Sequence, residues 1–504
     1  MTTSTSSSES AEGAVVVART KKSPSSLLVP SLSTILLCGL ALRLAVFLVP
    51  DLSAIPALLE RRPELSTPVS SYLTFKEALH LRKLYIDSTA SAATKLPKPY
   101  QSGTLYTPPL LLAFLGPLLE SRSAEAFNLI TALVWSIADL ITAACLADAY
   151  SRRVQSLVHP SKTRREENGK GAARGLANGQ EDALLKSWSP SKETIAALYL
   201  FNPFTLGTCW ARCTTGLNNC FVVLAIDAAL AASPIILAVS IATAALLSLY
   251  PALLLPALFL LCAQQATSSN QRRRHAKDRH EHQSRSFGAT LALCVFLTLV
   301  VLAILVHISF LAAAMDWTFI DRAYGTILLV PDLSPNIGLW WYFFIEIFDH
   351  FRSFFLLAFN VHLASYAVPL TIKYRQDELF ALTAFQGLIS TFKSYPTMSD
   401  ASLFLSLLSL SPQLFPYYRY PLVSLLLYTY ATLLLPALHH LWLNAGSGNA
   451  NFFYAITLVW ALAQGATTLD AMWAWGRWRW ELERPKMDPI LAPKRSAKRR
   501  VVQL

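Results

Sequence analysis

The chain has 504 residues, of which 53% are hydrophobic and only 15% are charged, and its mean hydropathy is +0.40. This composition leaves too little polar surface to coat a soluble globular protein, so it predicts a polytopic membrane protein. The formal net charge is +12. The basic residues concentrate at 152–186, 272–285 and 477–500, in stretches with few apolar anchors. We interpret these stretches as solvated cytosolic segments and not as a surface for nucleic acid.

The N-terminal residues 1–28 are rich in serine and threonine and have no apolar period, which predicts a disordered cytosolic segment. Residues 29–480 are expected to form a multi-spanning membrane domain, followed by a basic cytosolic tail at 481–504. The first span is predicted at 31–49. The mixed, amphipathic stretch 51–105 is then expected to be a lumenal loop that holds one or two surface helices.

Two apolar blocks follow this loop, at 108–119 and 126–149. A helix needs about 20 apolar residues to cross the hydrocarbon core. If both blocks crossed, the basic loop 151–190 would lie on the same side as 51–105, against the rule that lysine and arginine stay in the cytosol. We therefore predict that 126–149 crosses and that the shorter, proline-containing block is re-entrant or interfacial.

The later part of the chain continues the alternation of apolar and polar segments. Further crossings are expected at 192–211, 217–231, 233–248, 250–263, 288–314, a segment ending near 373, 378–394, 400–412, 421–440 and 451–475. The predicted fold is thus an all-α polytopic membrane protein with about 12 transmembrane helices. This count places the basic loop 264–287 and the tail on the same side as the N-terminus, as their charge requires.

Four polar clusters interrupt the apolar segments, at 212–219, 331–336, 393–400 and 444–451, and the predicted topology places all four at one membrane face. Their carboxamides and hydroxyls offer paired donors and acceptors for sugar hydroxyls and phosphates, while helix N-termini favour anions. A glycolipid headgroup fits this chemistry. Each cluster alone is also explained as a turn or a kinked helix, with Asn451 as the N-cap of the last span.

Charged residues inside predicted spans are costly and are usually paired. Asp139 and Asp227 lie in such spans, and Arg43 in the first span is a candidate partner. The chain has 7 cysteines, an odd number, mostly within apolar segments, so no disulfide framework is expected. Cys209 and Cys213 are one helical turn apart without further ligands, which favours packing over a metal site. No catalytic motif and no cofactor-binding motif is present, and no cofactor is expected.

Five stretches closely resemble one known family, the U subunit of the glycosylphosphatidylinositol (GPI) transamidase, PIG-U. They are LYLFNPFTLGTCWARCTTGLNNCFVVLAI at 198–226, SLYPALLLPAL at 248–258, VPDLSPNIGLWWYFFIEIFDHF at 330–351, FKSYPTMSD at 392–400 and LHHLWLNAGSGNANFFYAITL at 438–458. The likeness extends from about residue 43 to 480. It does not include the serine-rich start, the two basic loops or the tail.

The resemblance implies a non-catalytic subunit of the endoplasmic-reticulum complex that replaces a C-terminal signal with a preassembled GPI anchor. The nucleophilic cysteine is expected in another subunit, and the architecture is expected to be similar to GT-C glycosyltransferases. Other transamidase subunits, the GPI glycolipid and membrane lipids are the implied partners. By motif position, the residues expected to contact GPI are Asn218, Asn219, Asn449 and Asn451, with Lys393 and Asp332 as weaker additions.

An alternative is a GT-C mannosyltransferase that acts on lipid-linked GPI precursors. Such enzymes place an acidic catalytic pair in the first lumenal loop, because activation of a sugar hydroxyl needs a positioned carboxylate. The loop here contains acidic residues without a D-x-D-like pair, namely Asp51, Glu60, Glu64, Glu77 and Asp87. An ion-coupled transporter is disfavoured because no internal repeat is visible.

Overall fold

The computed structural model describes residues 30–90, 98–102, 105–119, 123–158, 190–276 and 286–487. Within these ranges the chain is helical and contains no strand, in agreement with the predicted all-α class. The predicted disordered segment 1–28 lies outside the described residues. So do residues 159–189 and 277–285 of the two basic loops and residues 488–504 of the tail.

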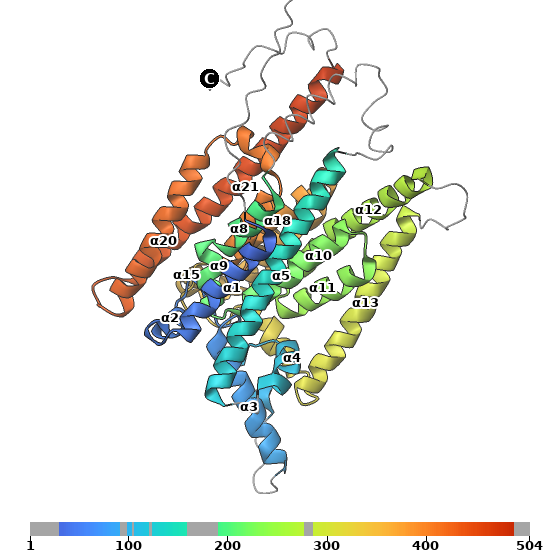
Figure 1. Cartoon of the computed structure of the whole chain (residues 1–504). Coiled ribbons are helices and arrows are strands. Elements are labelled where there is room, and N and C mark those ends of the chain that lie inside the picture. The colour runs from blue at the N-terminus through green and yellow to red at the C-terminus, as the bar shows by residue number, and fades with distance from the viewer. Residues whose placement is uncertain are drawn as a thin grey trace, which may run out of the picture.

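The N-terminal half of the chain forms helices of very different lengths (Figure 1). In chain order they are α1 (Leu32–Leu48), η1 (Pro50–Leu52), α2 (Ala54–Leu59), α3 (Tyr72–Ala90), η2 (Pro99–Ser102), α4 (Pro109–Leu119), α5 (Ala124–Val158), α8 (Lys192–Leu200), α9 (Pro203–Trp210), α10 (Thr214–Leu230), α11 (Pro234–Leu247) and η3 (Tyr250–Leu254). The chain turns by 83° between α1 and the segment Pro50–Leu59. Val49 is extended there, as expected for a residue before proline.

The C-terminal half contains most of the long apolar helices. They are α12 (Leu255–Ala276), α13 (Phe287–Ala312), η4 (Ile320–Gly325), α14 (Thr326–Leu329), α15 (Trp340–Glu346), α16 (Asp349–Ser365), α17 (Ala367–Lys373), α18 (Glu378–Phe392), α19 (Met398–Ser409), η5 (Pro412–Tyr417), α20 (Pro421–Leu443) and α21 (Ala450–Met487). α20 and α21 form a hairpin at one side of the bundle (Figure 1). η4 is one turn of π-helix.

Six helical segments are long and apolar enough to cross a membrane. They are Ala124–Ser156, Tyr250–Ser268, Phe287–Ala312, Asp349–Lys373, Pro421–Leu443 and Ala450–Leu482, and the bent pair that starts with α1 adds a seventh if it counts as one span. Other predicted crossings correspond to shorter apolar helices, α10, α11, α18 and α19, and the block predicted as re-entrant forms the short α4. The chain is therefore a membrane protein by its helices, while the count of about 12 crossings stays a prediction.

The two ends of the bundle differ in the charge of the adjoining sequence. Figure 1 shows the C-terminal ends of α5, α12 and α21 at the upper end, and the basic stretches of the sequence begin in the last turns of these three helices and continue beyond them. α3 lies at the opposite, lower end of the view, and the turn between α20 and α21 lies at the left. The basic stretches of the sequence thus adjoin one end of the bundle.

The predicted single span 192–211 is broken into two helices, α8 and α9. Proline at 203 cannot donate the hydrogen bond that would continue α8, so the helix ends at Leu200. The side chain of Asn202 then caps α9 by accepting a hydrogen bond from the backbone N–H of Phe204 at 2.9 Å. The break exposes the carbonyl of Leu200 to a side chain from α1.

That side chain is the guanidinium of Arg43, which is fully buried. Its Nε donates to Asp139 Oδ2 at 2.8 Å, and its Nη1 donates to the carbonyl oxygen of Leu200 at 3.0 Å. The hydroxyl of Tyr199 donates to the other carboxylate oxygen of Asp139 at 2.9 Å. The expected pairing of Arg43 with a buried acid is confirmed, and it joins α1, α5 and α8. The second acid, Asp227, pairs instead with Arg152 at 3.0 Å.

Removal of one partner of this pair is expected to destabilise the protein strongly. Asp139→Asn should cost about 3–5 kcal/mol, because the buried guanidinium of Arg43 loses its counter-charge. The measurement is the thermal unfolding midpoint of the detergent-solubilised chain. The double variant Arg43→Met/Asp139→Leu removes both charges and should be more stable than Asp139→Asn. If Asp139→Asn is as stable as the wild type, the pair does not hold the three helices together.

Candidate functional site

A polar pocket lies where several helices end. Its empty space is about 450 Å³, including the part that is open to solvent. It is lined by residues from loops and helix ends: Val69, Ser70, Tyr106, Pro108, Thr214, Thr215, Asn218, Leu247, Ser248, Tyr250, Ala323, Ile327, Lys393, Ser394 and Tyr395. Ala323 belongs to the π-helical turn η4, and such turns are frequent at functional sites. Nine of these fifteen side chains carry a hydroxyl or a carboxamide, which in an apolar bundle suits a small polar group.

The cation of the pocket is Lys393, which lies just after α18 and is only 5% exposed. Its Nζ donates to Asp400 Oδ1 at 2.6 Å. The other carboxylate oxygen of Asp400 accepts hydrogen bonds from the N–H and the hydroxyl of Thr397, in the capping box that starts α19. Because Asp400 is fixed by the helix start, it also fixes the lysine. Two ammonium protons of Lys393 remain for a ligand or water.

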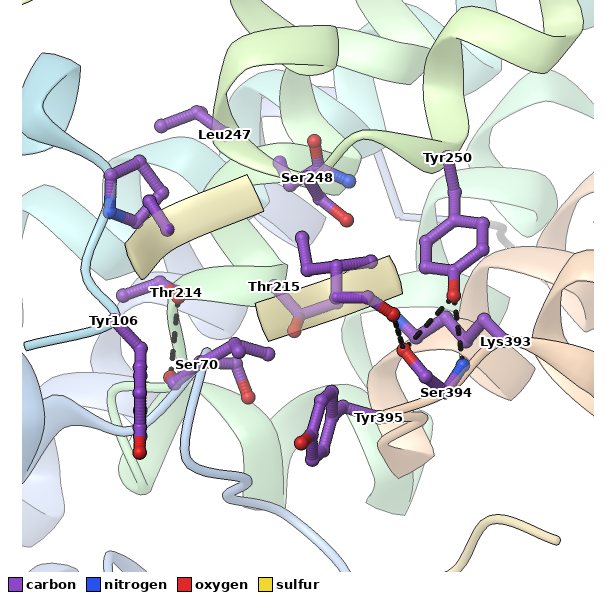
Figure 2. A pocket seen from close by; sticks show the side chains of 15 residues that line it. Ser70, Tyr106, Thr214, Thr215, Leu247, Ser248, Tyr250, Lys393, Ser394 and Tyr395 are labelled. Carbon is purple, nitrogen blue, oxygen red and sulfur yellow. Dashed lines mark hydrogen bonds between the residues drawn. The ribbon is translucent and has the colours of Figure 1, made fainter. Parts of the chain in front are cut away.

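Ser394 and Tyr250 connect this loop to the other side of the pocket (Figure 2). Ser394 donates its hydroxyl to the carbonyl oxygen of Ile327 at 2.9 Å, and its N–H donates to the hydroxyl of Tyr250, also at 2.9 Å. On the side of α10, the hydroxyl of Thr214 donates to the carbonyl oxygen of Ser70 at 3.2 Å. The pocket wall is therefore held by hydrogen bonds between segments that are far apart in sequence.

The adjacent residues Asn218 and Asn219 have different roles. Asn218 lines the pocket and is 6% exposed, and its Oδ1 is buried without a hydrogen-bond partner among the described residues. A buried, unpaired acceptor costs free energy, so it indicates an absent donor such as a ligand hydroxyl or a water. Asn219 instead donates from Nδ2 to the carbonyl oxygen and hydroxyl of Ser399, at 2.9 and 3.0 Å. Asn219 therefore joins α10 to α19.

Asp332 lies beside the pocket and not in its lining. Its side chain accepts hydrogen bonds from the N–H and hydroxyl of Ser334, and its carbonyl oxygen accepts one from the hydroxyl of Tyr395 at 2.6 Å. Burial raises the pKa of the Tyr395 hydroxyl, and the negative charge of Asp332 adds to this effect. The same two causes raise the pKa of Tyr106. Both tyrosines therefore remain neutral hydrogen-bonding groups at physiological pH.

Asn449 and Asn451 lie farther away, at the exposed turn between α20 and α21. The expected N-cap at Asn451 is wrong, because α21 starts at Ala450 and the side chain of Asn449 accepts the hydrogen bond from the N–H of Phe452 at 3.2 Å. Asn451 lies within the first turn, and its Oδ1 accepts from the hydroxyl of Tyr342. Since Tyr342 is in α15, this contact links the turn to the segment that carries Asp332.

Several pocket residues were not predicted from the sequence. Ser70, Tyr106 and Tyr250 lie in segments that look like ordinary loop or helix starts, and no local pattern distinguishes them. The only signal for Tyr250 was its place in a stretch that resembles a known family. Thr214 and Thr215, by contrast, belong to the predicted polar cluster 212–219.

Arg212 fixes the loop that precedes the pocket wall. It has a positive φ of 50°, which is uncommon for a residue other than glycine. Its guanidinium pairs with Glu60, donates to Asn128 and Thr131, and lies 3.9 Å above the ring of Tyr72. Glu60 is therefore a buried partner of Arg212 that helps to fix this loop.

Glu64 is the second buried acid of this region, at 3% exposure, and its Oε1 has no hydrogen-bond partner among the described residues. Burial raises the pKa of the Glu64 carboxyl above its ordinary 4.5, although a backbone hydrogen bond and Arg62 act against this. The folded state therefore holds the Glu64 proton more tightly than the unfolded state does. Protonated Glu64 contributes its full share of stability below pH 4.5, and this contribution is lost as the pH rises through the pKa of the folded state.

The variant Glu64→Gln should therefore be more stable than the wild type at pH 7, and the difference should vanish below pH 4.5, where the acid is protonated in both states. The measurement is the unfolding midpoint as a function of pH. Glu77→Gln, which changes an exposed acid in α3, is the matched control and should leave the profile unchanged. A wild-type advantage at pH 7 would show that the ionised Glu64 is stabilising.

Comparison with known proteins supports the resemblance found in the motifs. The family model of the GPI transamidase subunit PIG-U matches residues 37–460. The GPI transamidase component GAB1 of Saccharomyces cerevisiae is 31% identical over 86% of this chain and 92% of its own length. The GPI-anchor transamidase component PIGU of Homo sapiens is 30% identical over 88% of this chain and 93% of its own length. The PIGU component of Mus musculus is 31% identical over 88% of this chain and 94% of its own length. The chain belongs to the PIG-U family.

Proposed function

We propose that the chain is a non-catalytic component of a GPI transamidase in the endoplasmic-reticulum membrane, and that its pocket binds the GPI headgroup for transfer. Membership of the PIG-U family supports the complex, since the relatives are named as transamidase components. The observation that carries the headgroup proposal is the unpaired Oδ1 of Asn218 in a pocket that also holds Lys393.

The chemistry of the pocket suits a glycolipid headgroup. Sugar hydroxyls are both donors and acceptors, so they satisfy Asn218 Oδ1 and the surrounding serine, threonine and tyrosine hydroxyls. The ammonium of Lys393 offers its remaining protons to a sugar or phosphate oxygen. The pocket is small, so it takes a single polar group of such a headgroup and not the whole glycan.

Further contacts are proposed outside the pocket. Asp332 borders it through Tyr395, and the α15 segment continues from there to the turn that contains Asn449 and Asn451. We assign these three residues to the rest of the glycan and Asn219 to a supporting role through Ser399. Apolar side chains exposed on the long helices are available for the acyl chains.

In this proposal the chain contributes to the rate by proximity and orientation, and it forms no bond with the substrate. The bundle is proposed to cross the membrane about twelve times in a GT-C-like arrangement, with the shorter helices α10, α11, α18 and α19 supplying crossings beyond the long ones. The polar pocket then lies at the lumenal boundary, where anchor transfer takes place.

The two adjacent asparagines provide a matched test. In a transamidase complex that contains this chain, Asn218→Ala should reduce anchor attachment to a reporter protein about tenfold at limiting GPI, since one hydrogen bond to the ligand is lost. Complex assembly, measured by co-purification of the partner subunits, should not change. Asn219→Ala should instead lower the thermal midpoint of the chain, because the contact with Ser399 is lost. Undiminished attachment by the Asn218 variant would contradict the headgroup proposal.

A second test separates this function from the mannosyltransferase alternative. Asp51→Ala removes an exposed acid of the first loop without breaking an ion pair found among the described residues. We expect unchanged levels of mannosylated GPI precursors, measured by metabolic labelling of lipids. Asn451→Lys, at the exposed turn, is expected to cause complete but unattached GPI to accumulate while the complex still assembles. Loss of one mannosylated intermediate in the Asp51 variant would favour the transferase.

A further inference from the structure

The C-terminal helix α21 extends beyond the helix that pairs with it. It contains 38 residues, which at about 1.5 Å per residue exceeds the length needed to cross about 30 Å of hydrocarbon. Figure 1 shows its C-terminal end, in red, projecting past the start of α20. The part of α21 after about residue 470 therefore passes through a membrane interface and into the aqueous layer beyond it.

One exposed face of α21 changes character along this path. Leu462 and Leu469 are exposed apolar side chains, at 58% and 68%. Trp473, Arg477 and Trp480 come next with spacings of four and three residues, so they lie on one face of the helix. Along the helix axis the aliphatic side chains come first, and the aromatic and cationic side chains follow together. This matches a lipid, in which the hydrocarbon is followed by the ester region and the phosphate.

Arginine side chains lie over the exposed tryptophans of this face. The guanidinium of Arg419, at the start of α20, is 3.9 Å from the centroid of the Trp473 ring, and that of Arg477 is 4.5 Å from the centroid of Trp480. We call Arg419, Trp473, Arg477 and Trp480 the arginine–tryptophan patch. Both rings are exposed, at 48% and 42%. Stacking on a ring fixes the plane of a guanidinium and leaves its N–H edges free to bind an oxyanion.

The acids near the patch leave its charge only partly neutralised. Arg477 pairs with Glu481 at 3.3 Å, and Glu481 also accepts from the hydroxyl of Tyr417. The carboxylate of Asp470 is occupied by the backbone N–H groups of Arg419 and Tyr420. Within the described part of the chain, the guanidinium of Arg419 itself has no ion pair and no hydrogen bond. One full positive charge therefore faces outward at the level of the tryptophans.

We propose that the arginine–tryptophan patch binds the phosphate of an anionic glycerophospholipid of the surrounding leaflet, with its acyl chains along Leu462 and Leu469. The lipid is a structural ligand of this end of the bundle and is separate from the proposed GPI pocket. A leaflet lipid is the occupant because the aliphatic part of the face is continuous with the charged part. The basic tail after α21 adds charge of the same sign.

The test uses the full-length chain in a mild non-ionic detergent, titrated with phosphatidylserine or phosphatidylcholine and monitored by native mass spectrometry. Phosphatidylserine should bind more tightly, and its affinity should fall as salt is raised. The variant Arg419→Gln/Arg477→Gln should weaken phosphatidylserine binding about 25-fold, since each cation near an anionic surface contributes about fivefold. Binding of phosphatidylcholine should change little.

The matched control is Arg61→Gln/Lys83→Gln, which removes two exposed charges from the first loop and should leave the affinity unchanged. The variant Arg419→Lys/Arg477→Lys keeps the charge without the stacked plane and should lose only about threefold. Equal affinity for the two lipids, or an equal loss in the control, would overturn the proposal. Displacement of phosphatidylserine by millimolar inorganic phosphate alone would also overturn it, because the site would then bind a free anion. The salt dependence tests the wild type even where a variant fails to fold.

Discussion

The structure depends on one constraint, which is that a polar group among apolar helices must find its partner within the protein. Four charged pairs satisfy it, namely Arg43 with Asp139, Glu60 with Arg212, Arg153 with Asp377, and Lys393 with Asp400. All four have buried side chains, and the first three join segments that are far apart in sequence. Each such pair costs desolvation, so it fixes which helices are neighbours more than it adds stability.

One of the buried polar atoms that do not meet this constraint within the described residues lies in the candidate site. The carboxamide of Asn218 is as buried as these pairs, yet its acceptor is unpaired among the described residues, whereas the Nδ2 of Asn219 next to it donates two hydrogen bonds to Ser399. The segments around Asn218 are held by hydrogen bonds that do not involve it, from Ser394 to Ile327 and from Thr214 to Ser70. The pocket is therefore pre-organised without a ligand, and a ligand that supplies one donor completes it.

The sequence predicted the features that depend on composition and on charge in spans. The helical class, the pairing of Arg43 with an acid and the polar cluster that contains Thr214 and Asn218 all came from local patterns. Patterns did not predict how the clusters lie relative to one another. Asn219 faces a serine of α19 while Asn218 faces the pocket, because one residue along a helix is a rotation of about 100°. Asn449 caps α21 in place of Asn451, because the helix starts two residues earlier than expected. Ser70 and Tyr106 come from loops whose position is set by tertiary contacts alone.

The position of the pocket results from the lengths of its helices. A helix that crosses the whole hydrocarbon core leaves its unpaired N–H and C=O groups in water, but a shorter helix leaves them at a depth where protein or a cavity must supply partners. α10, α11, α14 and α18 are short, and each ends or begins beside the pocket. Side chains partly meet this demand, as Ser394 does for the carbonyl oxygen of Ile327 in α14. The same short helices that interrupt a regular pattern of long helices thus create the polar environment in which Lys393 and Asn218 lie. A chain of uniform long helices would have no such site at this depth, so the irregularity of the bundle and its proposed function have one physical origin.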